Sequence, residues 1–357
     1  MSAISLDPRF NHHPAVANKN HHQQGAAAAT ATATAEEIEG LIRVSKDGHV
    51  ERPAIIPNVP CTWSLDQNLV TSKDVFIDKL TNLWARIYVP SNYHPIHDES
   101  LPLLVYFHGG GFCVGSAAWS CYHQFLANLA AKAGCVVVSV NYRLAPENRL
   151  PTAYEEGFNA VMWIKQQAMN PSNENKSWLS KCNMSSLFLA GDSAGANIAY
   201  HVSTRLAANS DAVLRPLRLK GLVLIQPFFG GETRTASEKY ANQPPNSALT
   251  LSASDTYWRL SLPSGSSRDH PWCNPLAGGS AKLRELRVPA TMVCVSETDI
   301  LRDRNLEFCN ALVSAGKKVE TTMYRGVGHA FQVLHNSQSS QARTQEMMSH
   351  IKSFINQ

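Results

Sequence analysis

The chain has 357 residues, of which 44% are hydrophobic and 17% charged, and this composition is typical of a folded globular protein. Its formal net charge of +4, from 32 basic and 28 acidic residues, comes with no block of Lys or Arg, so we expect no nucleic-acid partner. The longest apolar runs, at residues 135–140 and 221–225, are far shorter than the run of about 18 residues that a membrane helix requires, so no membrane span is expected.

Residues 1–35 have the composition of a disordered, low-complexity tail, with two His pairs at 12–13 and 21–22 and an Ala- and Thr-rich tract at 25–35. The first ten residues lack the apolar segment of a secretory signal. The eight cysteines form no CxxC pair, which favours reduced thiols. We expect a cytoplasmic location and leave a nuclear location and organelle targeting by residues 1–35 open as alternatives.

The first ordered elements are predicted from residue 36 onward. Ile38, Leu41 and Ile42 fall on one face of a short amphipathic helix at residues 36–42. The Asp47-Gly48 pair then indicates a hairpin turn within residues 44–51. We expect a single domain that covers residues 36–357.

Apolar strands and amphipathic helices alternate along the rest of the chain. The predicted strands lie at residues 84–89, 101–107, 135–140, 186–190, 221–226, 290–296 and 319–324. The predicted helices lie at residues 122–132, 151–167, 194–206, 305–313 and 346–354. This alternation predicts an α/β fold, in which a mostly parallel central sheet is flanked by helices on both faces. Functional groups of such a sheet belong on the loops at the C-terminal ends of its strands.

Residues 227–289 interrupt this alternation. They contain seven prolines, among them the pair Pro244-Pro245, and the aromatic residues Tyr257, Trp258 and Trp272. We interpret this segment as an inserted cap or a region of long loops.

A candidate nucleophile lies in the sequence Gly191-Asp192-Ser193-Ala194-Gly195, between a predicted strand and a predicted helix. A sharp turn of this kind holds the serine above the sheet and needs small flanking residues because the backbone is crowded. The backbone amide of Ala194, at the start of the helix, points at the reacting oxygen. The pattern alone is also compatible with a structural glycine turn and an idle serine, and the strand-turn-helix context favours the nucleophile.

Three consecutive glycines, Gly109, Gly110 and Gly111, follow the predicted strand at residues 101–107. Their backbone N–H groups can turn toward a ligand without obstruction by side chains, as a developing oxyanion requires. The alternative is a flexible loop. The preceding His108 is expected to order this loop through hydrogen bonds rather than to act as a base.

A carboxylate and a histidine complete the candidate constellation. Asp299 and Asp303 both follow the strand at residues 290–296, and Asp299 is preferred because it lies nearer the end of that strand. Asp303 is expected to cap or charge the start of the next helix. His329, on a glycine-flanked loop after the last strand, would take the proton of Ser193 and return it to the leaving group. The order serine, aspartate, histidine is the one expected of a triad on this fold.

No metal site and no cofactor are predicted. The chain contains no H-E-x-x-H motif or comparable ligand spacing, and it has no glycine fingerprint of a nucleotide-binding loop. The sequence also identifies no protein partner.

The combined motifs resemble the plant carboxylesterases of the hormone-sensitive-lipase-like group, which have the α/β-hydrolase fold. The resemblance covers the chain from about residue 36 to the C-terminus and rests on residues 41–53, 108–112, 142–147, 191–195, 299–303 and 328–331. It implies a triad of Ser193, Asp299 and His329. It also implies an oxyanion hole built from Gly110, Gly111 and Ala194, with Gly109 completing the turn, and a lid to which residues 36–75 contribute.

The family also contains proteins that are not esterases. The gibberellin receptor has lost the triad histidine, whereas His329 is present here. Dehydratases and cyclases of specialised metabolism reuse the base for elimination, and acyl transfer to another acceptor leaves no mark in the sequence. We expect a carboxylesterase that hydrolyses small-molecule esters through an acyl-enzyme, with elimination and hormone-receptor-like binding as the alternatives.

Overall fold

The computed structural model describes residues 34–62, 70–91, 100–208, 211–241, 243 and 247–357. Nearly all of the predicted disordered tail, residues 1–33, lies outside the described residues. The chain divides into two units, of which the first ends at Ile55 and the second begins at Ile56. The two units are described separately below.

The first unit is a small antiparallel sheet with the order β1 (Thr34–Ile38), β2 (Ile42–Ser45) and β3 (Val50–Glu51). The predicted helix at residues 36–42 is therefore wrong. Gly40 has a φ of 71°, which suits a tight turn, and Glu37 pairs opposite Arg43 with an ion pair of 2.9 Å. The predicted turn at Asp47-Gly48 is confirmed, since Gly48, with a φ of 88°, lies in the turn between β2 and β3.

The second unit contains an eight-stranded sheet with the order β11-β10-β9-β8-β6-β7-β5-β4. Six strands are parallel: β6 (Leu101–Phe107), β7 (Val136–Asn141), β8 (Cys182–Asp192), β9 (Leu219–Ile225), β10 (Ala290–Ser296) and β11 (Val319–Tyr324). The antiparallel edge consists of β5 (Leu83–Pro90) and β4 (Val70–Asp78). The predicted mostly parallel sheet is confirmed. The prediction missed β4, and residues 70–75 of the expected lid segment lie in this strand.

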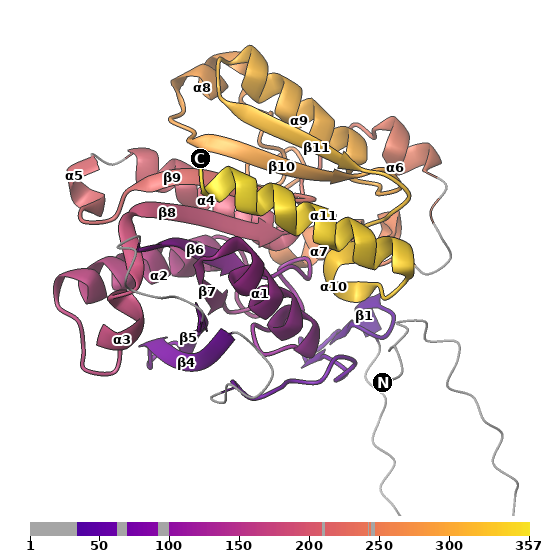
Figure 1. Cartoon of the computed structure of the whole chain (residues 1–357). Coiled ribbons are helices and arrows are strands. Elements are labelled where there is room, and N and C mark those ends of the chain that lie inside the picture. The colour runs from indigo at the N-terminus through magenta and orange to yellow at the C-terminus, as the bar shows by residue number, and fades with distance from the viewer. Residues whose placement is uncertain (1–33, 63–69, 92–99, 209–210, 242, 244–246) are drawn as a thin grey trace, which may run out of the picture. The chain divides into compact units, whose positions relative to one another are not determined.

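Helices cover both faces of this sheet (Figure 1). On one face, α1 (Ser120–Ala133), α10 (Phe331–Leu334) and α11 (Gln338–Ile355) pack over a core that includes Tyr106 and Phe188. On the other face lie α2 (Thr152–Met169), α4 (Ala194–Ala208) and α9 (Arg302–Ser314), and rings from α4 and α9 are in contact. Two short helices, α3 (Lys176–Leu179) and α5 (Asp211–Leu214), precede β8 and β9. The last helix begins earlier than predicted because Ser337 caps its N-terminus.

The segment at residues 227–289 contains three helices, α6 (Ala236–Tyr240), α7 (Leu251–Ser261) and α8 (Gly279–Glu285). Trp258 of α7 is buried and stacks on Phe228, with ring centroids 4.5 Å apart. Its ring also lies 5.5 Å from that of Phe112, which directly follows the glycine run. The segment is therefore folded against the loop that follows β6.

The register of the parallel strands aligns their C-terminal ends. Phe107 pairs with Val140 on one side and with Gly191 on the other, and Asp192 pairs with Ile225. The loops that follow β6, β8, β9, β10 and β11 consequently leave the same edge of the sheet. All predicted site residues lie on these loops or directly at their ends.

Candidate active site

Ser193 lies at the tight turn between β8 and α4 and has a φ of 52°. This left-handed conformation is strained for a residue with a Cβ atom and persists only where the surroundings enforce it. The crowding around it explains the flanking glycines. A Cβ atom on Gly195 would lie 1.9 Å from the carbonyl oxygen of Phe107, and one on Gly191 would lie 2.3 Å from the backbone of Gly195.

The structure brings Ser193, His329 and Asp299 together in one hydrogen-bonded chain. Nε2 of His329 is 2.9 Å from Oγ of Ser193, and Nδ1 of His329 is 2.7 Å from Oδ2 of Asp299. Because the carboxylate only accepts, Nδ1 carries the proton and Nε2 is free to accept from the serine hydroxyl. The second oxygen of Asp299 accepts from the N–H of Leu301 at 3.0 Å. All three side chains are buried.

Asp303, the other candidate carboxylate, is not part of the hydrogen-bonded series formed by Ser193, His329 and Asp299. It is in the first turn of α9, where an acidic residue favours the helix dipole. Its oxygens accept from the N–H of Ser237 at 2.6 Å and from Nε of Arg302 at 3.0 Å. Asp303 thus lies in the first turn, where it was expected to charge the start of the helix, but its side chain bonds to Ser237 and Arg302 and does not cap α9.

The glycine run divides into two functional parts. The N–H of Gly109 donates to the hydroxyl of Tyr122 at 2.8 Å and to Oδ1 of Asp192 at 3.0 Å, so it is engaged in holding the turn. In the described part of the chain, the N–H groups of Gly110, Gly111 and Ala194 have no protein acceptor. These three amides are therefore the ones available to an oxyanion.

Steric crowding explains why Gly110 and Gly111 carry no side chain. Their φ angles are 108° and 58°, in the left-handed region. A Cβ atom on Gly110 would lie 2.1 Å from the carbonyl oxygen of Val114, and one on Gly111 would lie 2.2 Å from the ring of Tyr257. The ring of Tyr257 thus packs directly on the glycine run.

His108 lies at the base of the same loop and does not contact the triad. Its Nδ1 donates to the carbonyl oxygen of Gly109 at 2.8 Å, and its ring stacks on Tyr142 at 4.3 Å. The hydroxyl of Tyr142 in turn donates to the carbonyl oxygen of His108. Burial lowers the pKa of His108 to about 4, so the ring is neutral near pH 7. These contacts fit the expected role of ordering the loop.

Asp192, the residue before the nucleophile, was not singled out from the sequence. Its buried carboxylate accepts from the hydroxyls of Tyr106 at 2.8 Å and Tyr122 at 2.9 Å, as well as from the N–H of Gly109. Burial raises its pKa to about 6, and these hydrogen bonds oppose that effect. The signal in the sequence is an acidic residue at the end of an otherwise apolar strand, a position where a carboxylate requires partners.

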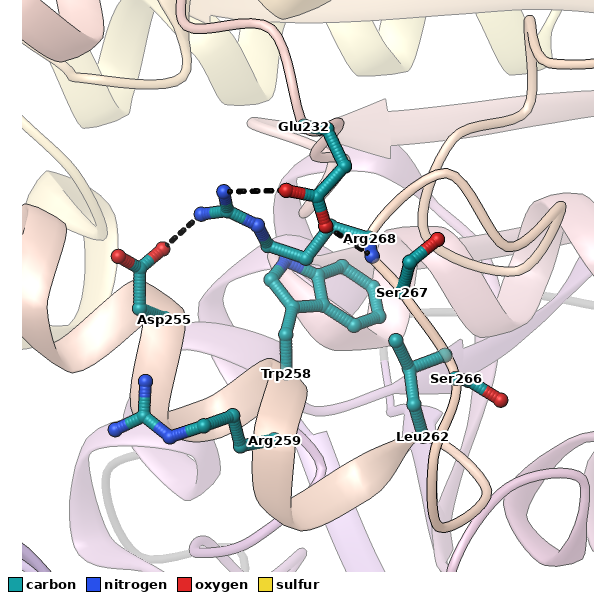
Figure 2. A pocket seen from close by; sticks show the side chains of 8 residues that line it. All are labelled: Glu232, Asp255, Trp258, Arg259, Leu262, Ser266, Ser267 and Arg268. Atoms are coloured by element: carbon teal, nitrogen blue, oxygen red, sulfur yellow. Dashed lines mark hydrogen bonds and ion pairs between the residues drawn. The ribbon is translucent and has the colours of Figure 1, made fainter.

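A cavity of about 290 Å³ lies beside α7, between this helix and the loop at residues 266–268. Figure 2 shows the guanidinium of Arg268 between the carboxylates of Asp255 and Glu232. Asp255 also accepts from Arg234 at 2.5 Å. Since Arg268 is paired on both sides, we interpret it as a structural cation that ties α7 to the neighbouring loop.

Neither a metal site nor a membrane span is found among the described residues. No group of three or more His, Cys, Asp or Glu side chains there is arranged to hold a metal ion. No helix in that part of the chain combines the length and the apolar composition needed to cross a membrane. The His pairs at residues 12–13 and 21–22 lie outside the described residues.

Comparisons with known proteins agree with this geometry. Residues 104–333 match a family model described as the alpha/beta hydrolase fold. A probable carboxylesterase 6 of Arabidopsis thaliana is 48% identical over 320 residues, which cover 90% of this chain and 91% of the relative. A 2-hydroxyisoflavanone dehydratase of Glycyrrhiza echinata is 34% identical, covering 92% of this chain and 99% of its own. A solved esterase structure from Pyrobaculum calidifontis has a TM-score of 0.64 and 27% identity, covering 79% of this chain and 85% of its own.

Proposed function

This chain belongs to the plant carboxylesterases of the α/β-hydrolase fold and is a carboxylic ester hydrolase, and we propose that Ser193, His329 and Asp299 carry out its reaction. The observation that carries the proposal is the continuous chain of contacts from Oγ of Ser193 through the imidazole to the carboxylate of Asp299. This arrangement supplies a nucleophile, a base in reach of its proton, and a group that fixes the tautomer of the base.

In the proposed reaction, Oγ of Ser193 attacks the ester carbonyl while Nε2 of His329 takes the hydroxyl proton. The negative charge on the carbonyl oxygen is stabilised by the N–H groups of Gly110, Gly111 and Ala194. The tetrahedral intermediate expels the alcohol, which receives the proton from His329, and an acyl-enzyme forms. Water, activated by the same imidazole, then attacks the acyl group and releases the acid and free Ser193. The carboxylate of Asp299 stabilises the imidazolium in both steps.

Elimination is the second candidate function, because a dehydratase is among the relatives that match nearly the full chain. A third is ligand binding, since a gibberellin receptor of Arabidopsis thaliana is 35% identical over 81% of both chains. The hydrogen bond between Nε2 of His329 and Oγ of Ser193 supports hydrolysis over both, because only acyl transfer needs a deprotonated serine.

The test is turnover of a short p-nitrophenyl acyl ester by the purified protein and by the variant Ser193→Ala. We expect saturable turnover by the wild type and a loss of at least about 10⁴-fold in kcat for the variant, with the circular dichroism spectrum unchanged. Undetectable wild-type turnover, or equal rates in the two proteins, would contradict the proposal. Loss of water from a hydroxylated substrate without ester turnover would support elimination, and saturable ligand binding without turnover would support the receptor function.

A further inference from the structure

Gln226 is the first residue after β9, and its side chain is completely buried. Its Oε1 accepts from the N–H of Ala330 at 2.7 Å, and its Nε2 donates to Oγ of Ser296 at 2.6 Å. Ala330 directly follows His329, and Ser296 is the last residue of the strand that leads to Asp299. One side chain thus bridges the loops that carry the base and its carboxylate.

The backbone at this bridge is held in a conformation that it would rarely adopt alone. Ala330 has a φ of 55° and Gln226 a φ of 47°, both in the left-handed region. For residues with a Cβ atom this conformation is strained, and it persists only where contacts with the surrounding structure enforce it. The hydrogen bond from Ala330 to Gln226 is such a contact, and it acts on the residue next to the imidazole.

Residues 225–228, at the end of β9, also bind the backbone of the nucleophile. The N–H of Ser193 donates to the carbonyl oxygen of Ile225 at 2.8 Å, and the N–H of Phe228 donates to the carbonyl oxygen of Ser193 at 3.0 Å. The N–H of Gln226 donates to the carbonyl oxygen of Cys294 in β10 at 2.8 Å. The end of β9 therefore connects the backbone of the nucleophile to the loop of the base.

We propose that Gln226 is a positioning residue for ester hydrolysis, which fixes Nε2 of His329 against Oγ of Ser193. This inference rests on the proposed function. Gln226 acts through the N–H of Ala330 and Oγ of Ser296, so we assign it no contact with the reacting atoms. A displacement of the base by about 1 Å lowers the rate by about 10²-fold. The loss falls on kcat rather than on KM, because the geometry of the base matters in the transition state and not in ground-state binding.

The test compares Gln226→Met with the matched control Asn175→Leu. Methionine keeps the length of the side chain and removes the amide, and therefore both hydrogen bonds. Asn175 is also a buried amide, bonded to Gln167, Ser172 and Trp178, but it precedes the N-terminal end of β8, whereas Ser193 follows the C-terminal end. Both variants should lower the melting temperature. Only Gln226→Met should lower kcat for a short p-nitrophenyl ester, by about 10²-fold, with KM changed by less than about twofold.

A second variant keeps the test decisive if Gln226→Met does not fold. Ser296→Ala removes one of the two bonds, so it should lower kcat by a smaller factor at unchanged KM. Where Gln226→Met does fold, the loss in the double variant should equal that of Gln226→Met alone, because both changes act through one bridge.

The outcomes separate this inference from the proposed function. An inactive wild type would refute the proposed function. An active wild type whose kcat is unchanged in Gln226→Met, or unchanged in Ser296→Ala where the first variant does not fold, would overturn the role of Gln226 alone. A change confined to KM, or an equal loss of kcat in Asn175→Leu, would overturn it as well.

Discussion

Replacing Asp192 by asparagine should flatten the dependence of stability on pH. The carboxylate of Asp192 is buried, and burial raises its pKa from 3.8 to about 6. Between pH 3.8 and about 6, Asp192 is therefore protonated in the folded state and ionised in the unfolded state. The wild type is for this reason most stabilised below pH 3.8, and it loses that contribution as the pH rises through about 6.

The size of the effect follows from the shift in pKa. A difference of about two units corresponds to about 3 kcal/mol in the free energy of unfolding, of which about half falls between pH 5 and pH 7.5. The asparagine side chain does not titrate, so the variant lacks this loss. We expect the stability of Asp192→Asn relative to the wild type to increase by about 1–2 kcal/mol over that interval.

The assay is urea unfolding of both proteins at pH 5, 6 and 7.5. Asp78→Asn is a suitable control because hydrogen bonds to Thr81 and Leu80 lower the pKa of this carboxyl below 3.8. Asp78 is therefore ionised in both the folded and the unfolded state over this pH range, and its substitution should produce no trend. Parallel stability curves for the wild type and Asp192→Asn would refute the reasoning.

The same substitution should affect catalysis through the glycine run. The single oxygen of asparagine can still accept from Tyr106 and Gly109, but its amide nitrogen cannot accept from the hydroxyl of Tyr122. We expect kcat to fall by less than the 10²–10³-fold that direct loss of an oxyanion donor causes, since Gly110, Gly111 and Ala194 keep their amides.

Two further predictions concern the triad and the glycine run. Asp299→Asn should lower kcat by about 10⁴-fold, because the imidazole loses its tautomer-fixing acceptor. Asp303→Asn, which alters contacts at the start of α9 and with Ser237 of α6 but none of the imidazole, should leave kcat close to the wild-type value in the same esterase assay, and equal losses in the two variants would contradict the assignment. Gly111→Ala should lower kcat by at least about 10²-fold, because a Cβ atom 2.2 Å from the ring of Tyr257 must displace the loop, and steady-state kinetics showing wild-type kcat would refute this.

The strands and helices could be predicted where burial produces a strong periodic pattern. Strands such as β6 and β7, buried on both faces, appear as continuous apolar runs, and the structure confirms them. The edge strand β4 was missed because Lys73 and Asp74 interrupt its pattern and Phe76 is exposed. The wrong helix at residues 36–42 followed from spacing alone, whereas Gly40 and the partner strand decided the hairpin. The cytoplasmic location expected from the cysteines stays a prediction.

The sequence by itself determined the order of the elements and the loops that carry Ser193, Asp299 and His329, because hydrophobic periodicity and short motifs are local properties of the chain. Only the tertiary structure decided which groups meet. Asp299 rather than Asp303 reaches the imidazole, Asp192 holds an amide 83 residues away, and Gln226 holds one 104 residues away. The physical reason is that a buried polar group takes its partners from whatever strands and loops the sheet places beside it. These partners depend on the strand order and register of the sheet, and they cannot be predicted from a local pattern in the sequence.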